Sequence, residues 1–383
     1  MLLLPPKATS DPGSDIIKME VIDLLFSLTP KTKKEDLFDR EKELKDLEKL
    51  LQTYPIVVIT GLRRVGKSSL VKVFLNESDL LHITVDGRRL YETSGGNISS
   101  HHLTRFLGEE LSRISKSQKL LNVLKRVRGI TVSGTSIELN PKEFSLSDLL
   151  EKLNETAKRR KKKMVIFFDE AQYLRYYGSR GGSDLLALLA YSYDNFENVR
   201  FIISGSEVGV LHDFLKLEDY SSPLHGRGIG FLTVRPFTFD QSVDFLMEGF
   251  REVGEKVNFD VEEIVREIDG IVGYLVLFGV KYLEKKNKDE ALKEVFHAVK
   301  ALFEKEMEEL RKRSERYPFI LRQISRGINT WSALKNIFRA KGDFIGDSRL
   351  YSLLETLEKM SFIEKTQSGY RIVDPVFEKI LSE

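Results

Sequence analysis

Residues 59–72 read ITGLRRVGKSSLVK, and the eight residues Gly61–Ser68 (GLRRVGKS) within them decide the fold. They match the Walker A pattern of glycine, four residues, then Gly-Lys-Ser. The apolar run Ile56–Ile59 precedes the pattern, and Ser68–Leu75 after it has helical spacing. Glycines allow the chain to curl so that successive N–H groups point at phosphate oxygens. The stretch therefore predicts a phosphate-binding loop between a buried strand and a helix.

The loop also predicts its ligands, which are ATP or ADP with Mg²⁺. Lys67 is expected to bridge the β- and γ-phosphates, and the Ser68 hydroxyl to coordinate Mg²⁺. The positive end of the helix dipole adds to the attraction for phosphate. The residues of this segment expected to bind nucleotide are Gly61, Arg63, Arg64, Val65, Gly66, Lys67, Ser68 and Ser69.

A second acidic motif lies further along the chain, in Val165–Gln172 (VIFFDEAQ). An apolar strand that ends in two carboxylates is typical of a Walker B motif. We expect Asp169 to hold Mg²⁺ through water and Glu170 to polarise the attacking water. A small-molecule kinase needs no such glutamate, so the pair favours hydrolysis. A helicase is set aside because its other motifs are missing.

Two further segments carry candidate catalytic residues. Phe201–Gly209 (FIISGSEVG) is a strand that ends in hydroxyl residues, of which Ser206 is the first choice and Ser204 the second for sensing the γ-phosphate. A simple turn at the end of the strand is the alternative. In the next segment, Arg227 comes shortly before another strand. It either stabilises charge in the transition state, supplied by a neighbouring subunit, or has a plain structural role.

The order of elements predicts an α/β fold with three parts. Strands alternate with helices up to Pro236, which indicates a parallel sheet. Four stretches with helical period follow, and the chain ends in three helix-like stretches and a hairpin, as in a winged helix-turn-helix. The expected domains are a tail (1–32), a nucleoside-triphosphatase core (33–236), a helical lid (237–313) and a winged helix (314–383). The core also contains a predicted hairpin at 129–139 of undetermined role.

Composition limits the setting in which the protein works. The chain has no cysteine, which fits a reducing interior, and no apolar run long enough to cross a bilayer, so we expect a cytoplasmic protein without a membrane partner. Charged residues make up 31%, which favours a thermophile. Residues 310–383 carry 14 Lys and Arg against 9 Asp and Glu, a net charge of +5, whereas the rest carries −3. This basic C-terminal part suggests nucleic acid as a partner.

The polar face of the expected recognition helix suits double-stranded DNA. Its opposite face forms an apolar stripe from Leu350 to Met360, as a core-facing helix requires. Glu355 lies among the polar residues and would repel the phosphate backbone. The candidate DNA contacts on the helix and wing are Arg349, Ser352, Thr356, Lys359, Lys365 and Arg371. The alternative is a winged helix that docks onto a protein.

Together, these segments resemble the archaeal P-loop ATPase family, which belongs with the AAA+ and STAND ATPases and is related to origin-recognition-type initiators. The resemblance rests on DLFDREKEL, GLRRVGKSSL, FFDEAQ, ISGSEVG, SPLHGR, VRPF, GYLVLFG and YRIVDPVF in this order. It implies a P-loop NTPase core of AAA+ type, a helical lid and a winged helix. It also implies that Phe38 and Arg40 lie near the adenine. Here Val272 stands where the family's lid usually has proline, which puts its contacts with nucleotide in question.

Two functions follow from these patterns. The first is an AAA+-type ATPase that hydrolyses ATP, changes its lid angle and acts on DNA, with ATP-dependent assembly into a homo-oligomer. The second is a slow, STAND-like nucleotide switch whose winged helix is presented differently to DNA or to a protein. Glu170 favours the first function, and the absence of a recognisable substrate-pulling loop favours the second.

Overall fold

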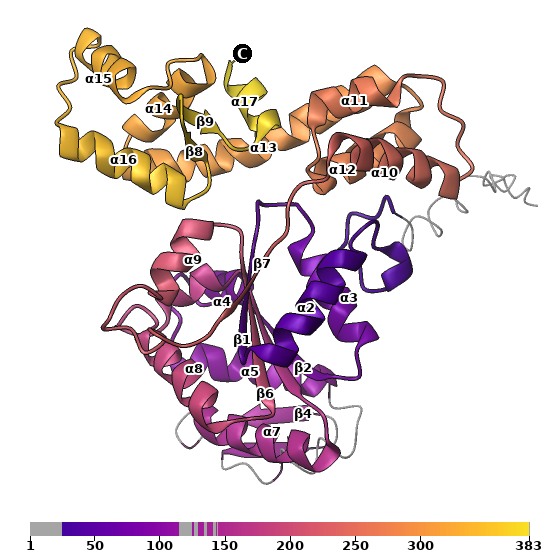
Figure 1. Cartoon of the computed structure of the whole chain (residues 1–383), viewed down its shortest axis with the longest axis vertical. Helices are drawn as coiled ribbons and strands as arrows, with labels where there is room; N and C mark the ends of the chain where they lie inside the picture. The colour runs from indigo at the N-terminus through magenta and orange to yellow at the C-terminus, as the bar shows by residue number, and fades with distance from the viewer. Residues whose placement is uncertain are drawn as a thin grey trace, which may run out of the picture.

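A computed structural model describes residues 25–114, 125, 129–133, 136–140, 143 and 145–382. The ribbon has three parts, with a sheet domain at the base and two helical parts above it (Figure 1). The remaining residues, which include most of the predicted tail and part of the predicted turn of the 129–139 hairpin, lie outside the described parts.

The core is a five-stranded sheet in the order β2-β5-β6-β1-β7, with every neighbouring pair parallel. The strands are β1 (Ile56–Thr60), β2 (Leu81–Asp86), β5 (Met164–Asp169), β6 (Val199–Gly205) and β7 (Gly230–Thr233). Because all of them run the same way, their carboxyl ends meet at one edge, where ligands bind in open α/β sheets. The predicted strands and their parallel arrangement are confirmed.

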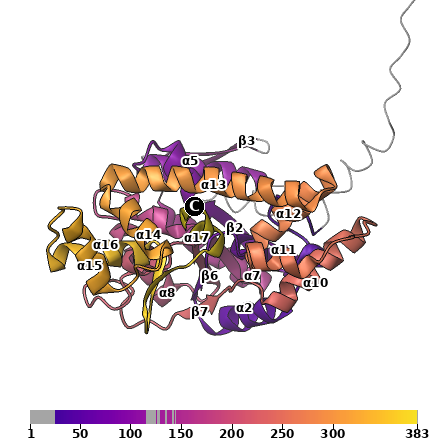
Figure 2. The ribbon, with the colours of Figure 1, turned by 90° about the horizontal axis from the view of Figure 1, so that it is seen from above.

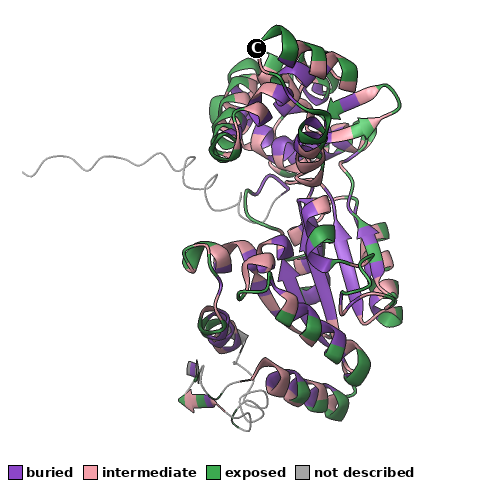
Figure 3. Ribbon diagram, turned by 90° about the vertical axis from the view of Figure 1, so that its left-hand side faces the viewer, coloured by how far each residue is buried: buried purple, intermediate pink, exposed green. Residues whose placement is uncertain are grey.

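Helices cover both faces of this sheet, which explains why β1 and β5 are apolar and buried at nearly every position (Figure 3). Along β1, Val57 and Ile59 face one layer, whereas Ile56 and Val58 face the other. The covering helices are α2 (Glu41–Thr53), α3 (Lys67–Glu77), α4 (Gly87–Thr93), α5 (Ser100–Ile114), α7 (Leu146–Arg160), α8 (Ser183–Asn195) and α9 (Val208–Leu215).

Three short elements complete the core. Two are the 3₁₀ helices η2 (Lys34–Asp36) and η3 (Ala171–Tyr176). The third is the predicted hairpin, formed by β3 (Ile130–Ser133) and β4 (Ser136–Leu139), which lies against α5. The hairpin is therefore a separate two-stranded unit beside the main sheet.

The helical lid consists of α10 (Phe239–Glu252), α11 (Val261–Ile268), α12 (Val272–Lys285) and α13 (Lys288–Arg313). The segment before the core is built into it, because Leu25 and Phe26 are buried in the lid. A Cβ atom on Gly249 or Gly279 would lie 2.4–2.5 Å from the Phe26 ring, so only glycine allows this ring to pack there. Part of the predicted tail thus belongs to the packed structure.

The C-terminal part has the expected winged-helix elements, with an additional last helix. They are α14 (Arg316–Ser325), α15 (Trp331–Ala340), α16 (Asp347–Lys359), β8 (Ile363–Thr366), β9 (Gly369–Ile372) and α17 (Pro375–Ser382). The long helix α13 runs from the lid into this part (Figure 2). Phe303 of α13 stacks on Phe377 of α17 with ring centroids 3.9 Å apart. Lid and winged helix therefore share one continuous core.

The described helices include none that is both long and apolar enough to cross a membrane.

Candidate functional site

The loop between β1 and α3 has the backbone that a phosphate-binding loop requires. Gly61 has φ +149° and Gly66 has φ +95°, both in the region that favours glycine. A Cβ atom on Gly61 would lie 2.3 Å from the Val234 carbonyl oxygen, so a larger residue does not fit there. Gly66 is the N-cap of α3, which places the first N–H groups of that helix at the loop.

Lys67 lies at the centre of the loop and is only 5% exposed. Its Nζ donates to the carbonyl oxygens of Gly61 at 2.9 Å and Leu62 at 2.7 Å. Burial lowers the pKa of Lys67 to about 8, against the opposing effect of Glu170 and Asp169. Among the described residues, the hydrogen-bond partners of this cation are neutral carbonyls, with two carboxylates nearby, so it can exchange those partners for phosphate oxygens.

Asp169, at the end of β5, joins the two motifs. Ser68 Oγ donates to its Oδ2 at 2.8 Å, and Ser204 Oγ donates to its Oδ1 at 2.5 Å. Burial raises the pKa of Asp169, against the effect of these two hydrogen bonds. A carboxylate and a hydroxyl this close are hard oxygen ligands of the kind that Mg²⁺ prefers. The pair therefore fits an ion held jointly by Ser68 and Asp169.

Glu170 follows directly and has a left-handed backbone, with φ +49°. Its Oε2 accepts hydrogen bonds from Ser206 Oγ at 2.7 Å and from Gln172 Nε2, and Arg88 Nη2 lies 3.7 Å away. Burial acts to raise the pKa of Glu170, but Lys67, Arg88 and these hydrogen bonds outweigh it and hold the pKa below its usual value. The carboxylate is therefore ionised and fixed in orientation.

Both serines considered from sequence lie in this network, with different partners. Ser206 contacts Glu170, and Ser204 contacts Asp169. Gln172 was not among the predicted site residues, although it is buried and its side-chain amide reaches Glu170. Its place two residues after Glu170 in the acidic motif is the one sequence signal that could have indicated it.

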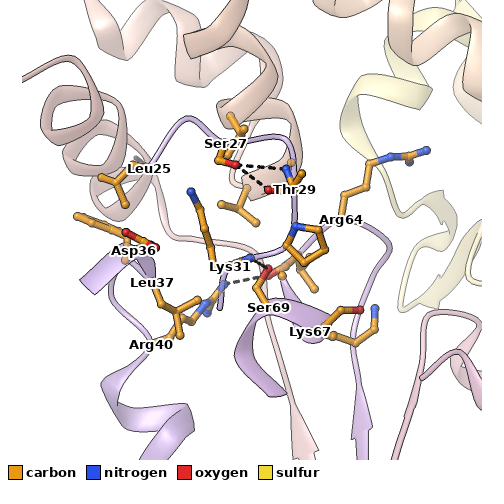
Figure 4. Close-up of a pocket in the computed structure, with 18 of the residues that line it drawn as sticks. Leu25, Ser27, Thr29, Lys31, Asp36, Leu37, Arg40, Arg64, Lys67 and Ser69 are labelled. Carbon is orange, nitrogen blue, oxygen red and sulfur yellow. Dashed lines mark hydrogen bonds between the residues drawn. The ribbon is translucent and has the colours of Figure 1, made fainter. Parts of the chain in front are cut away.

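In front of the loop lies a cavity of about 350 Å³ (Figure 4). Gly66, Lys67, Ser68, Ser69 and Glu170 line its polar side. Its apolar side comes from both the core and the lid, through Leu37, Phe38, Phe237, Phe245 and Val276. The cavity thus offers a phosphate-binding end and an end suited to a planar base.

Phe38 and Arg40 lie at this apolar end. The Phe38 ring packs edge-on against Phe237 and Phe245, with centroids 5.9 and 5.5 Å apart. Arg40 is buried, stacks over Phe237 at 4.4 Å, and donates to the carbonyl oxygens of Arg235 and Val65. Arg40 therefore ties the core to the beginning of the lid beside the cavity.

The segment before the core also borders the cavity, which the sequence patterns did not indicate. Its lining residues are Leu25, Ser27, Leu28, Thr29, Pro30 and Lys31. The Lys31 N–H donates to Ser69 Oγ at 3.1 Å, and the Leu25 N–H donates to Glu252 of the lid at 2.9 Å. The segment thus crosses from lid to loop at the cavity mouth (Figure 4).

Two loop arginines have partners outside the core sheet. Arg63 pairs with Glu207, at the start of α9, and with Glu306 of α13. Arg64 lies over the rings of Tyr274 and Phe303 at 5.7 and 5.8 Å. Its carbonyl oxygen accepts from the Gly273 N–H at 3.0 Å. The loop is therefore in direct contact with the lid. The contact lies at the turn where Val272 stands in place of the proline that is usual in the family.

Arg227 is not part of this cluster within one chain. It pairs with Asp194 at 2.6 Å, bonds the Pro223 carbonyl oxygen and lies over the Tyr193 ring.

The candidate DNA residues fall into two groups. Arg349 and Lys365 are exposed. Arg371 is exposed as well but, like Lys359 and Thr356, has a partner within the chain. Lys359 pairs with Asp213 of α9 at 3.0 Å and with Glu355, Arg371 pairs with Glu364, and Thr356 Oγ1 bonds the Ser352 carbonyl oxygen at 2.8 Å. The C-terminal end of α16 therefore rests on the core.

Residues 37–278 match the family described as "ATPase domain predominantly from Archaea", and residues 311–373 match the family described as "MCM protein C-terminal winged helix-turn-helix domain". The Walker-type ATPase PABY2304 of Pyrococcus abyssi is 45% identical, with a TM-score of 0.85 over 94% of this chain and 100% of that chain.

More distant similarities extend across most of the chain. The ORC2 protein of Aeropyrum pernix, solved in ADPNP–ADP complexes, is 14% identical, with a TM-score of 0.63 over 94% of this chain and 96% of that chain. At that identity the likeness shows the fold. The uncharacterised protein MJECL04 of Methanocaldococcus jannaschii is 24% identical over 337 residues, or 85% of this chain, which spans 62% of that protein's length.

Proposed function

Because the chain belongs to the family of ATPase domains found predominantly in Archaea, we propose that it binds ATP with Mg²⁺ in the cavity before the phosphate loop and hydrolyses it to ADP and phosphate. One observation carries the proposal. Lys67, Ser68 and Glu170 come from two distant segments and line one cavity, Ser68 is hydrogen-bonded to Asp169, and the charges of both carboxylates act on Lys67.

Each of these residues has a distinct task. The loop N–H groups and Lys67 bind the phosphates, since Lys67 is a buried cation that can release its carbonyl partners. Ser68 and Asp169 would hold Mg²⁺, which neutralises phosphate charge when bound. Glu170 orients a water molecule, and Ser206 and Gln172 fix the orientation of Glu170. Phe38 and Arg40 belong to the base end.

We further propose that the nucleotide controls the position of the winged helix. Arg63 is held between Glu207 of the core and Glu306 of α13, so the loop is in contact with the helix that enters the winged-helix part. Lid and winged helix share one core and would therefore move as a unit. A phosphate that shifts the loop would change the contact that holds this unit on the core.

Double-stranded DNA is the partner that the charges favour. The net charge of +5 on residues 310–383 and exposed Arg349 and Lys365 suit phosphate contacts. The match to a winged helix-turn-helix supports the same partner, because that fold presents a recognition helix to the major groove.

A second candidate function has a specific observation in its favour. Phe344 is 83% exposed and Tyr351 is 59% exposed, and both are large apolar side chains on the winged helix. Exposed aromatic residues are typical anchors of protein interfaces. A slow nucleotide switch that docks a protein partner would use this surface.

Turnover measurements distinguish the two functions. ATP hydrolysis is measured with the full chain, alone and with duplex DNA, at low salt. Turnover that DNA stimulates supports the DNA-acting ATPase, and slow turnover that DNA leaves unchanged supports the switch. Failure to bind ATP in calorimetry would refute the site itself.

Arg227 adds a proposal about assembly. If a neighbouring subunit supplies it to the site, Arg227→Ala should lose hydrolysis and keep ATP affinity, and a mixture with Lys67→Ala should regain some activity. If the chain remains monomeric in ATP and the mixture shows no rescue, the role of Arg227 is structural, through its ion pair with Asp194.

A further inference from the structure

A third arginine, Arg88, lies beside the acidic motif, and sequence patterns did not single it out. It is the second residue of α4, which begins directly after β2. Strand β2 is paired with β5 in a register that sets Asp86 opposite Asp169. The first turn of α4 therefore starts at the same sheet edge as the carboxylates of the site.

The close approach of this turn to the site depends on Gly87. A Cβ atom there would lie 2.7 Å from the carbonyl oxygen of Glu170 and 3.2 Å from that of Asp169. The Asp86 carboxylate accepts from the Arg89 N–H at 3.0 Å and so caps the helix. Glycine and cap together hold Arg88 next to Glu170.

The guanidinium of Arg88 has an N–H donor without an acceptor among the described residues. Nη2 lies 3.7 Å from Glu170 Oε2, beyond hydrogen-bond distance, and the group is 5.7 Å from the Tyr173 ring centroid. Its Nε is buried and has no hydrogen-bond partner among the described residues. A buried donor without an acceptor costs free energy. Such a donor is suited to an oxygen that arrives with a ligand.

The other cations near the site have different roles. Lys67 belongs to the phosphate loop, and Arg63 is already paired with two glutamates. Within the described parts of the chain, Arg88 contacts one carboxylate, that of Glu170. Arg88 therefore lies beside the carboxylate expected to orient the attacking water.

We propose that Arg88 is a catalytic arginine supplied within the same chain, which binds the γ-phosphoryl group of ATP and stabilises its charge during hydrolysis. This rests on the proposed ATPase site. In the step, the water oxygen forms a bond to the γ-phosphorus and the bond from that phosphorus to the β,γ-bridging oxygen breaks. Glu170 accepts the proton of the water, and ADP and phosphate leave. Arg88 uses the free Nε and the Nη groups as donors to phosphoryl oxygens.

The test compares Arg88→Ala with Arg88→Lys and with the control Arg89→Ala. Arg89 neighbours Arg88 on α4 but faces Glu109 and Glu110 at 3.6 and 3.5 Å, away from Glu170. We expect Arg88→Ala to lower kcat by about 10³-fold, the size of effect that such arginines have in related phosphoryl transfer. ADP affinity should be unchanged, Arg88→Lys should recover part of the rate, and Arg89→Ala should behave like the wild type.

A second readout does not depend on turnover. ADP with aluminium fluoride mimics the phosphoryl group in transfer, so wild-type protein should trap it and Arg88→Ala should not. A double variant, Arg88→Ala with Glu170→Gln, should trap less than Glu170→Gln alone. If the double variant and Glu170→Gln trap the complex equally, Arg88 acts only through Glu170, and direct contact between Arg88 and the phosphoryl group is overturned.

Mixing two variants distinguishes this proposal from one in which a neighbouring subunit supplies the arginine. Arg88→Ala and Lys67→Ala affect the same site, so their mixture should show no rescue. Three results would overturn the inference: rescue in the mixture, wild-type turnover of Arg88→Ala, or a loss of ADP affinity in Arg88→Ala as large as its loss of turnover. Wild-type protein that neither binds nor hydrolyses ATP would instead refute the proposed function.

Discussion

Ser68 Oγ donates a hydrogen bond of 2.8 Å to Asp169 Oδ2, across 101 residues of sequence. The bond exists because β1 and β5 flank β6 in a parallel sheet, so the loop after one and the carboxylate after the other leave the same edge. The hydroxyl and carboxylate that would share a metal ion are thus already in contact. The phosphate loop therefore needs little rearrangement to bind its ligand.

Removal of the buried cation tests the site directly. Lys67→Ala should weaken ATP binding more than tenfold, which is about 1.4 kcal/mol, because Lys67 is the cation that the motif fixes at the phosphates. Calorimetry with ATP and Mg²⁺ measures the affinity. Lys72→Ala, on the same helix α3, is the control, and equal affinity in both variants would contradict the assignment of Lys67.

The fold and the centre of the site were predictable because they have local patterns. A complete phosphate-loop motif between strand and helix, and an apolar strand ending in two carboxylates, each indicate chemistry within a few residues. Gln172, Arg88 and the Leu25–Lys31 segment have no such signature. Arg88 and the Leu25–Lys31 segment matter through neighbours distant in sequence, as in the approach of Gly87 to Glu170 or of Phe26 to Gly249, whereas Gln172 shows its role only through the direction of its side chain toward Glu170.

The contact between recognition helix and core is another feature without a local signal. Arg349 and Lys359 look alike in sequence, as basic residues on the polar face of one helix. Asp213 of α9 pairs with Lys359, whereas Arg349 is exposed. Only the packing of the winged helix on the core distinguishes exposed Arg349 from Lys359, which is held in an ion pair.

Glu170→Gln should keep ATP affinity and slow hydrolysis by about 10²–10⁴-fold, the usual contribution of a general base. The amide keeps the shape of the side chain but cannot accept the proton of the water. The measurement pairs calorimetry with steady-state phosphate release. Wild-type turnover in this variant would make Glu170 a bystander.

Removal of the ion pairs between the core and the upper part should release the winged helix. Glu306→Ala with Asp213→Ala removes one partner each of Arg63 and Lys359. The exposed Lys359–Asp213 pair contributes about 0.2–1 kcal/mol, and Arg63 keeps Glu207 as a partner, so the docked state should lose population without unfolding. Hydrogen exchange at α9 and at the end of α16 should rise. Glu364→Ala, which breaks a pair within the wing, is the control and should leave that exchange unchanged.

Asp374 gives a pH-dependent test of the shared core. Its Oδ2 accepts from the Tyr274 hydroxyl at 2.6 Å, and burial raises the pKa of Asp374 above its usual value. A carboxyl with a raised pKa in the folded state loses free energy of unfolding as pH rises through that pKa. Asp374→Asn should therefore gain stability relative to the wild type as pH rises above the usual pKa of an aspartate, measured by urea unfolding.

The control for this experiment has the opposite sign. Arg316 lowers the pKa of Asp343, so that carboxylate stabilises the fold above its unfolded-state pKa and the effect is lost as pH falls. The free energy of unfolding of Asp343→Asn should thus become lower than that of the wild type as pH rises. The same trend in both variants would contradict the assignment for Asp374.

Duplex binding tests the proposed partner, and the structure distinguishes its residues. Arg349→Glu with Lys365→Glu should weaken binding and flatten its salt dependence, because the log–log slope falls by roughly 0.9 for each phosphate that the protein no longer neutralises. Asp213→Asn should tighten binding, because it frees Lys359 from its partner on the core. Fluorescence anisotropy of a labelled duplex at several salt concentrations measures both effects, and the ATP affinity of the Arg349→Glu, Lys365→Glu variant is the control that should not change. If the wild type fails to bind even at low salt, the winged helix docks onto a protein, and Phe344 and Tyr351 become the residues to vary.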